Sequence, residues 1–276
     1  MRAPARAWSA ARRTLFYLSL IVLALGIVFP FLWMILASLK TQVQIMDMQK
    51  LFVFRPTTDN YRQVFTEYSF TKPMFNSLAI AVASTVLGLL LGLPAAYSIA
   101  RFRVARWGVI LLISRIIPGL TFLVPWYIFF ARLRLIDTYA AMILSHLLVG
   151  LPLIAWIMIP YFEALPRSLE DSGRVDGCSN YQAFWHIVLP LAGPGIVTAV
   201  LLAFIYSWNN FMFALALSGY HTKTLTVAIF NFVEYALINW GGLMAASVLI
   251  TLPVIVISLV LQRYVVQGLT AGAIKG

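Results

Sequence analysis

The feature that most constrains this chain is a series of six apolar stretches, each long enough for a helix to cross a lipid bilayer. A bilayer core of about 30 Å needs about 20 residues at the helical rise of 1.5 Å per residue. We therefore predict an all-α integral membrane protein with six transmembrane helices. The stretches are Leu15–Leu39, Met74–Ala100, Trp107–Phe130, Thr138–Phe162, Leu191–Leu215 and Trp240–Gln262.

The composition excludes a soluble protein. Hydrophobic residues make up 62% of the chain and charged residues 11%, against about 45–50% and 25% in soluble domains. The net charge of +11 does not indicate nucleic acid, because no Lys/Arg patch with interleaved aromatic residues occurs. The single cysteine, Cys178, excludes an internal disulfide framework and a cysteine-based metal cluster.

The basic residues predict the topology. An arginine-rich start resembles a signal peptide, but the apolar run after it is too long and no A-x-A cleavage site follows, so we expect a retained first helix. Lys and Arg near the first two helices favour cytoplasmic N- and C-termini. We expect a cytoplasmic segment over residues 1–14, a transmembrane domain over 15–262 and a cytoplasmic tail over 263–276. Residues 218–239 are expected to form an outer loop with a short amphipathic or re-entrant piece.

Few polar side chains lie inside the predicted helices. Arg115 lies nine residues into its stretch, about 13 Å deep, where an ionised group costs a few kcal/mol or more. It is expected to face a wet cavity, to make a structural contact with backbone carbonyls near Pro118, or to pair with another subunit. Asn209 and Asn210 also need hydrogen-bond partners, which are either neighbouring helices or a substrate. His146 is more typical of a packed polar residue than of a proton relay.

The loop between the fourth and fifth stretches, residues 163–190, carries helix-capping signals. Ser168 is expected to cap a first short helix, and Gly177 suits the left-handed residue that would end it. Ser179 and Gln182 predict a capping box for a second helix. The loop is therefore expected to form either a rigid knob projecting from the membrane or an amphipathic interfacial connector.

This loop resembles the "EAA" signature of ABC importer permeases, E-A-A-x3-G-x9-I-x-L-P. The spacing matches throughout, although D-S-G replaces the first triplet and Glu170 precedes it. The residues that stand at the defined positions of the pattern are Asp171, Ser172, Gly173, Gly177, Ile187, Leu189 and Pro190.

Two further segments resemble the maltose-type carbohydrate permeases of that family. The last residues, from Gln262, are close to Q-R-x4-G-L-T-x-G-A-x-K-G. The run Trp208-Asn209-Asn210 is similar to the W-N-[DE] run of that group, with Asn210 in place of the acid. The resemblance covers most of the chain.

The resemblance implies a type I ABC importer transmembrane fold in a bacterial cytoplasmic (inner) membrane, and a sugar or sugar derivative as substrate. It implies a second homologous permease subunit, two ATP-binding subunits and an extracytoplasmic solute-binding protein as partners, besides membrane lipid. The residues expected at the ATPase are Glu170, Asp171, Ser172, Gly173, Asp176, Gly177, Ile187, Leu189 and Pro190 in the loop, and Gly268, Thr270, Gly272 and Lys275 in the tail.

No catalytic residue or cofactor is expected in this chain. ATP and Mg²⁺ would bind the partner subunits, because no lysine here has the glycine spacing of a phosphate-binding loop. An importer of a non-sugar solute remains an alternative. A proton-coupled carrier would need intramembrane acids, and only Glu163, at a cytoplasmic end, comes close. An intramembrane enzyme would need a catalytic cluster that the sequence lacks. If Arg115 lines the cavity, an anionic group on the cargo is expected.

Overall fold

The computed structural model describes residues 10–102, 105–117, 119–233 and 238–273. Within these ranges the elements are helices, and the β contact there is an isolated antiparallel bridge between Val233 and Ile238. The predicted all-α class is therefore confirmed. The chain forms two compact units, Met1–Tyr68 with Phe230–Leu249, and Ser69–Ile229 with Ile250–Gly276.

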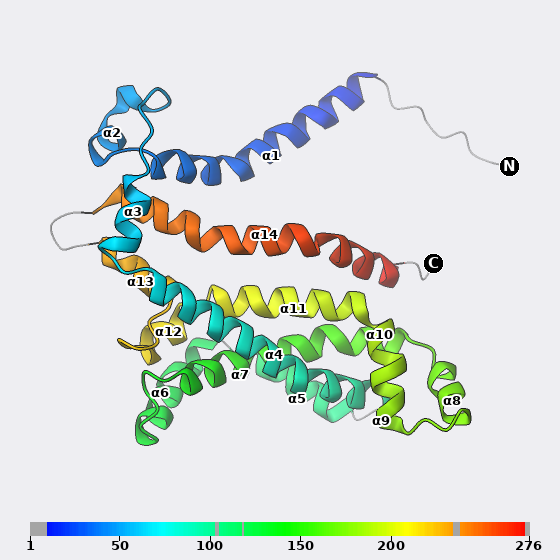
Figure 1. The fold of residues 1–276 in the computed structure, drawn as a ribbon. Helices are drawn as coiled ribbons and strands as arrows, with labels where there is room; N and C mark the ends of the chain where they lie inside the picture. Colours follow the sequence, from blue (N-terminus) through cyan, green and yellow to red (C-terminus); the bar gives the residue numbers. More distant parts are fainter. Residues whose placement is uncertain (1–9, 103–104, 118, 234–237, 274–276) are drawn as a thin grey trace. The chain divides into compact units, whose positions relative to one another are not determined.

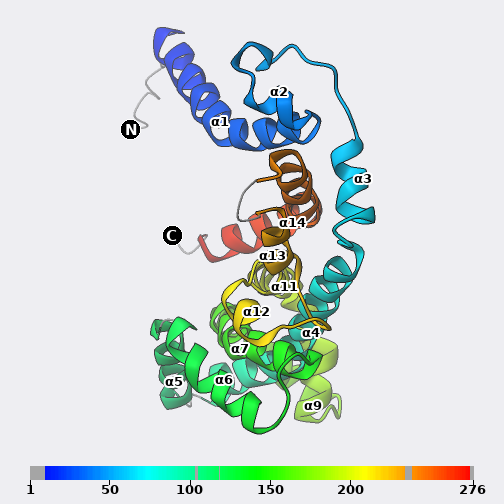
Figure 2. The same ribbon diagram turned by 90° about the vertical axis from the view of Figure 1, so that its left-hand side faces the viewer.

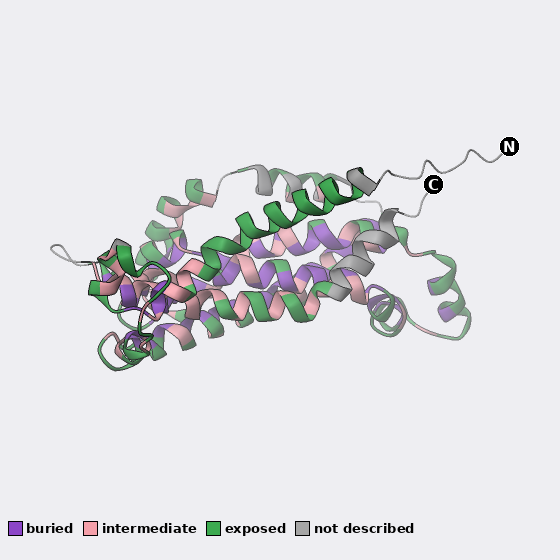
Figure 3. Cartoon of the chain, turned by 90° about the horizontal axis from the view of Figure 1, so that it is seen from above, coloured by how far each residue is buried: buried purple, intermediate pink, exposed green. Residues whose placement is uncertain are grey.

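The first unit begins with α1 (Ala10–Ser38), whose apolar side chains are exposed from Leu15 to Leu32 (Figure 3). Such a continuous apolar surface requires lipid or another protein around it. After α1 come α2 (Gln42–Met46), the 3₁₀ turn η1 (Met48–Lys50) and α3 (Asp59–Thr66). Figure 2 shows the long connection that runs from α2 to α3.

This connection has its own small core. The side chain of Lys40 is buried, with Nζ 5.0 Å from the ring centre of Trp33 and 4.7 Å from that of Phe54. Its Nζ also donates to the Leu51 carbonyl oxygen at 2.6 Å. The Asn60 amide donates to the carbonyl oxygen of Lys40 at 2.8 Å. Cation–π contacts therefore replace water around the charge of Lys40.

The second unit is a helical bundle in which α4 (Thr71–Phe102), α7 (Tyr139–Ala164) and α11 (Gly193–Trp208) pack side by side (Figure 1). Small residues let these helices approach closely. A Cβ at Gly88 would lie 2.7 Å from Cδ1 of Ile154, and one at Gly195 would lie 2.6 Å from the ring of Tyr161. The remaining elements of this unit are α5 (Ala105–Ile116), η2 (Gly119–Phe122), α6 (Leu123–Arg132), α8 (Ser168–Val175), α9 (Asn180–Ala183), η3 (Phe184–Val188), α10 (Leu189–Leu191), α12 (Met212–Leu217) and α13 (Leu225–Ala228), followed by η4 (Ile229–Phe232) at its boundary.

Six uninterrupted spanning helices are not confirmed. Among the described residues, four helices are long and apolar enough to cross a membrane: α1, α4, α7 and α14 (Trp240–Ala273). The third predicted stretch is divided between α5 and α6, because a proline at 118 disfavours helical geometry in the residue before it. In the fifth stretch, α11 is too short to count as a spanning helix by itself. It reaches that length only together with the preceding helical segment Asn180–Leu191, from which it is bent by 79°.

Residues 218–239 form no spanning helix where the structure describes them, as predicted; α13 and η4 have four residues each. Asp137 holds the start of this segment. Its carboxylate accepts hydrogen bonds from the backbone N–H groups of Gly219 (2.8 Å), His221 (2.9 Å) and Thr222 (2.8 Å), and from the Thr222 hydroxyl (2.8 Å). Burial raises the pKa of Asp137, but these donors outweigh burial and lower the pKa to about 2.

Candidate functional site

The loop after α7 folds into two short helical segments that extend beyond the ends of α7 and α11 (Figure 1). We call residues 165–191 the knob. The first segment is α8, and the second consists of α9, the π-helical turn η3 and α10. The prediction that Ser168 caps α8 is wrong. Arg167 occupies the cap position without a side-chain bond, and the first turn is closed by the Glu170 N–H, which donates to the Arg167 carbonyl oxygen at 3.0 Å.

The turn between the two segments follows the sequence signals. Gly177 has a φ of +89°, in the left-handed region that glycine adopts without steric cost. The Cys178 N–H donates back to the carbonyl oxygen of Gly173 at 2.9 Å. Ser179 and Gln182 form the predicted capping box, with bonds of 3.3 Å to the Ser179 hydroxyl and 2.9 Å to the Gln182 side chain. The turn and the start of α9 are therefore fixed by local geometry.

The two segments of the knob pack directly on each other. A Cβ on Gly173 would overlap Cδ1 of Ile187, so only a glycine fits there with Ile187 in its present rotamer. These two residues belong to the EAA-like pattern and lie 14 positions apart in the sequence. Phe184 and Val188 bury their side chains in the same core as Phe162 of α7. The knob is therefore continuous with the core of the helical bundle.

The two neighbouring acids of α8 have opposite environments. Glu170 is buried, with a side-chain exposure of 3%, and its carboxylate lies 2.5 Å from Nε of Arg101 on α4. The Tyr97 hydroxyl donates to the other carboxylate oxygen at 2.6 Å. Asp171 is 63% exposed and pairs with the exposed Arg174 at 2.9 Å. Of these two acids, Asp171 is thus the one presented at the knob surface.

The outer surface of the knob is exposed and partly apolar. Val175 is 88% exposed, and Tyr181 is 72% exposed. Asp176 ends α8 at this surface. Of the remaining pattern residues, Ser172 and Pro190 are exposed and Leu189 is buried.

The predicted polar pair in the fifth stretch lies where helix α11 ends. Asn210 is buried, and its side-chain oxygen accepts the Phe213 N–H at 3.1 Å, so it stabilises the start of α12. Its neighbour Asn209 is exposed. The Trp208 indole N–H donates to the Ile250 carbonyl oxygen of α14 at 3.0 Å. The pair is therefore divided between a structural residue and a surface residue.

His146 is a packed polar residue, as predicted. It is buried in α7, and its Nδ1 lies 2.7 Å from the Ser207 hydroxyl of α11. That hydroxyl lies 2.9 Å from the hydroxyl of Ser84 on α4. The three side chains connect three helices of the bundle within an apolar interior.

Several predicted site residues fall outside what can be described. Arg115 lies on α5, but its side chain is outside the described part. Gly268, Thr270 and Gly272 lie on the last turns of α14, where only the helical backbone is described. Lys275 lies beyond the described residues altogether. Their roles stay predictions.

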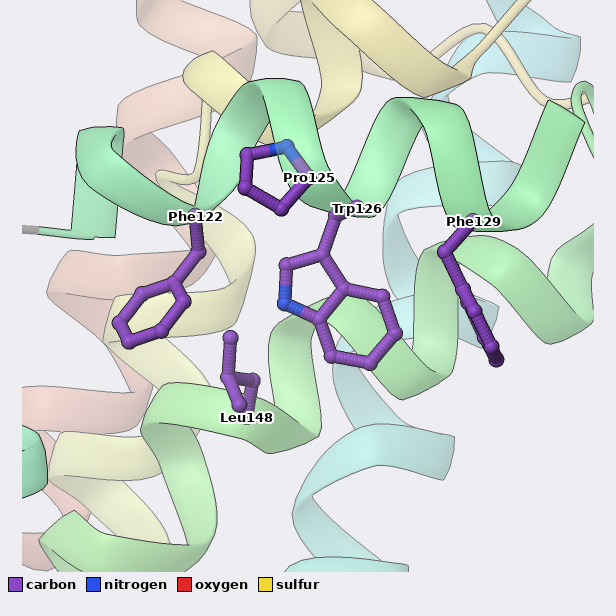
Figure 4. A pocket seen from close by; sticks show the side chains of 5 residues that line it. All are labelled: Phe122, Pro125, Trp126, Phe129 and Leu148. Atoms are coloured by element: carbon purple, nitrogen blue, oxygen red, sulfur yellow. The ribbon is translucent and has the colours of Figure 1, made fainter.

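One recess was not foreseen from the sequence. It has a volume of about 420 Å³ and lies between α6 and α7, lined by Phe122, Pro125, Trp126, Phe129 and Leu148 (Figure 4). Its lining is almost wholly apolar, so it offers a sugar few hydrogen-bonding groups. Among the residues described, no group of three His, Cys, Asp or Glu side chains is placed to hold a metal ion.

Comparison with known proteins agrees with this architecture. Residues 84–271 match the model of the family described as "Binding-protein-dependent transport system inner membrane component". The chain is 34% identical to the trehalose transport system permease protein SugB of Mycobacterium tuberculosis, with 96% of this chain and 99% of that protein covered. It is 34% identical to the sulfoquinovosyl glycerol transport system permease protein SmoH of Agrobacterium fabrum, covering 92% of this chain and 91% of that protein.

A solved structure has the same fold. A chain of a bacterial ABC transporter that imports the acidic polysaccharide alginate superposes with a TM-score of 0.81. The match covers 95% of this chain and all of that one, at 21% sequence identity. The predicted importer transmembrane fold is confirmed by this likeness, which at such identity speaks for the fold alone.

Proposed function

From the premise that the chain belongs to the family of binding-protein-dependent transport system inner membrane components, we propose that it is the permease subunit of an ATP-driven importer for a sugar or sugar derivative. Relatives of nearly the same length that transport trehalose and sulfoquinovosyl glycerol support the substrate class. The observation that carries the proposal is the knob, whose EAA-like residues form a compact projection with an exposed face.

In this proposal the knob docks on an ATP-binding subunit in the cytoplasm. Two such subunits, a second permease and an external solute-binding protein complete the transporter. Exposed side chains on α8, including Asp171 and Val175, would contact the ATPase. The exposed apolar surface of α1 would face lipid or the second permease. Both termini would be cytoplasmic, with the tail residues Gly268, Thr270, Gly272 and Lys275 between the ATPase subunits.

The mechanism that follows is alternating access. Closure of the two ATPase subunits on ATP would move the knobs of both permeases together, and the bundles would open a cavity to the outside. There the binding protein would release its ligand. Arg115 and the exposed Asn209 are the residues of this chain that we propose for contact with the cavity. Hydrolysis would then separate the ATPase subunits and reopen the cavity inward.

A pull-down of the tagged chain from solubilised native membranes tests the assembly. Mass spectrometry is expected to identify a second permease, an ATPase and a solute-binding protein in the eluate. The binding protein can then be screened against sugars to identify the cargo. Recovery of a folded chain alone, which transports solute in liposomes without ATP, would replace the proposal with a secondary carrier.

A further inference from the structure

The cytoplasmic end of α4 carries two side chains that reach into the knob. Tyr97 and Arg101 are four residues apart, so they lie one turn apart on the same face of the helix. From the sequence, Arg101 is only one of several basic residues that indicate a cytoplasmic helix end. In the structure its side chain is 8% exposed and is directed at α8 instead of solvent.

Both side chains converge on Glu170. Arg101 Nε lies 2.5 Å from one carboxylate oxygen, and the Tyr97 hydroxyl donates to the other at 2.6 Å. A second link runs from Arg167, whose Nη2 donates to the Arg101 carbonyl oxygen at 2.9 Å. Glutamate and arginine are almost never fully buried unless they are paired. Removing one partner of such a pair leaves an uncompensated buried charge. A buried ion pair and a hydrogen bond therefore hold α8 to α4.

Tyr97 also contacts the second segment of the knob. Its ring centre lies 4.8 Å from that of Phe184 in η3 and 5.8 Å from that of Phe162 in α7. One turn of α4 therefore touches both segments of the knob and the end of the neighbouring helix. Because α4 packs along α7 and α11, a displacement of the knob would act on all three helices of the bundle through this turn.

The exposed acid of α8 offers a contrast. Asp171 and Arg174 pair within the same helix and are 63% and 50% exposed, and such surface pairs contribute little to stability. The acids of α8 therefore have different tasks. Asp171 is available to a partner, whereas Glu170 is occupied within the chain.

We infer that Glu170 and Arg101, with Tyr97, form an internal brace that transmits movement of the knob to α4. The inference rests on the proposed function, since it assigns a positioning role within the same coupling site. Glu170 then acts without touching the ATPase, although it adjoins the residues that would.

The test uses the complete transporter with its ATPase, second permease and binding protein, reconstituted in lipid nanodiscs for hydrolysis and in liposomes for uptake. Glu170→Gln keeps the size of the side chain and an acceptor for Tyr97, but removes the ion pair. Because the buried Arg101 then lacks its partner, we expect less of this variant to assemble. Each assembled complex should keep basal ATP hydrolysis within about twofold of the original and lose about tenfold in solute imported per ATP. Glu163→Gln is the matched control, because Glu163 is an exposed acid in the last turn of α7.

A second pair of variants separates coupling from folding. Arg101→Gln leaves the buried carboxylate of Glu170 without its ion-pair partner, so the amount of assembled complex should fall. The double variant Glu170→Gln/Arg101→Gln removes both charges, and we expect it to regain abundance without regaining coupling. If Glu170→Gln and the double variant both import as much solute per ATP as the original complex, the brace is merely structural and the inference is wrong.

The measurements distinguish failure of the proposed function from failure of the brace. If the original chain neither co-purifies with an ATPase nor supports ATP-dependent uptake, the proposed function itself is wrong. If the original complex couples hydrolysis to uptake and Glu170→Gln does so equally well, only the brace is refuted.

Discussion

At the scale of single residues, the turn of the knob and its attachment to α4 depend on contacts of different range along the chain. Gly177 and the Ser179–Gln182 capping box were predicted, because a left-handed turn and a helix cap depend on residues close together in the sequence. The roles of Glu170 and Arg101 were not, because these residues are 69 positions apart in the sequence and only the packing of α4 against the knob brings them together. No local signal distinguishes Glu170 from the exposed Asp171 beside it.

Replacement of Gly177 should uncouple the transporter. Its φ of +89° costs an L-residue roughly 1–2 kcal/mol, so Gly177→Val should distort the turn and reduce uptake several-fold at normal membrane abundance. Gly177→Asn is the control, because asparagine tolerates this conformation better than other residues. Uptake and ATP hydrolysis measured on reconstituted complexes would check this. Normal coupling in Gly177→Val would argue against a fixed turn.

Asp137 should make stability depend on acid. Its pKa is about 2 in the folded chain, below the ordinary value of 3.8, so the folded state binds fewer protons than the unfolded state in this range. The stabilisation is fully present above pH ~4 and is lost as the pH falls towards ~2. Asp137→Asn should therefore be less stable than the original protein at neutral pH, with a smaller difference at pH ~2.

Thermal unfolding of the purified protein in detergent, followed at several pH values, measures this effect. A stability difference between Asp137→Asn and the original protein that does not shrink on acidification would show that the carboxylate charge is not what holds residues 219–222.

At the scale of elements, hydropathy predicts where apolar segments lie but not where they break. α1, α4, α7 and α14 run through the predicted stretches without a break, although each has a proline inside the helix. The third stretch divides near Pro118, and the fifth ends at Asn209 because Asn210 starts a new helix through its bond to the Phe213 N–H. Mean hydropathy over some 20 residues does not detect either interruption, although both depend on single residues of the sequence, Pro118 and Asn210.

The contact between α8 and η3 gives a prediction at this scale. Gly173→Ala should force Ile187 out of its present rotamer, because the new Cβ would overlap Cδ1 of Ile187. Overpacking of this kind costs roughly 1–3 kcal/mol. The double variant Gly173→Ala/Ile187→Val removes the overlapping carbon and should recover the loss. The amount of complex with ATPase retained after purification would measure both effects. A double variant no better than the single one would contradict direct packing.

At the scale of the whole molecule, the sequence indicated a membrane permease because its composition and its two motif regions agree. The cavity residues could not be predicted to the same degree, since in the proposed transporter a second permease subunit would complete the transport pathway. The role of Arg115 stays a prediction.

We expect Arg115 to act through its charge. Arg115→Leu should abolish uptake, whereas Arg115→Lys should retain a substantial part, because lysine keeps the positive charge without the planar guanidinium. Uptake of labelled solute at matched abundance would compare them. Equal loss in both variants would point instead to guanidinium geometry or to a structural contact.

The central claim is that this chain imports a solute only when a separate ATPase acts on its knob. The most direct measurement is uptake into liposomes that contain the purified complex, with ATP inside and loaded binding protein outside. We predict uptake that requires ATP and the binding protein and that falls several-fold in Gly177→Val. Uptake that continues without ATP, driven by a proton gradient alone, would contradict it.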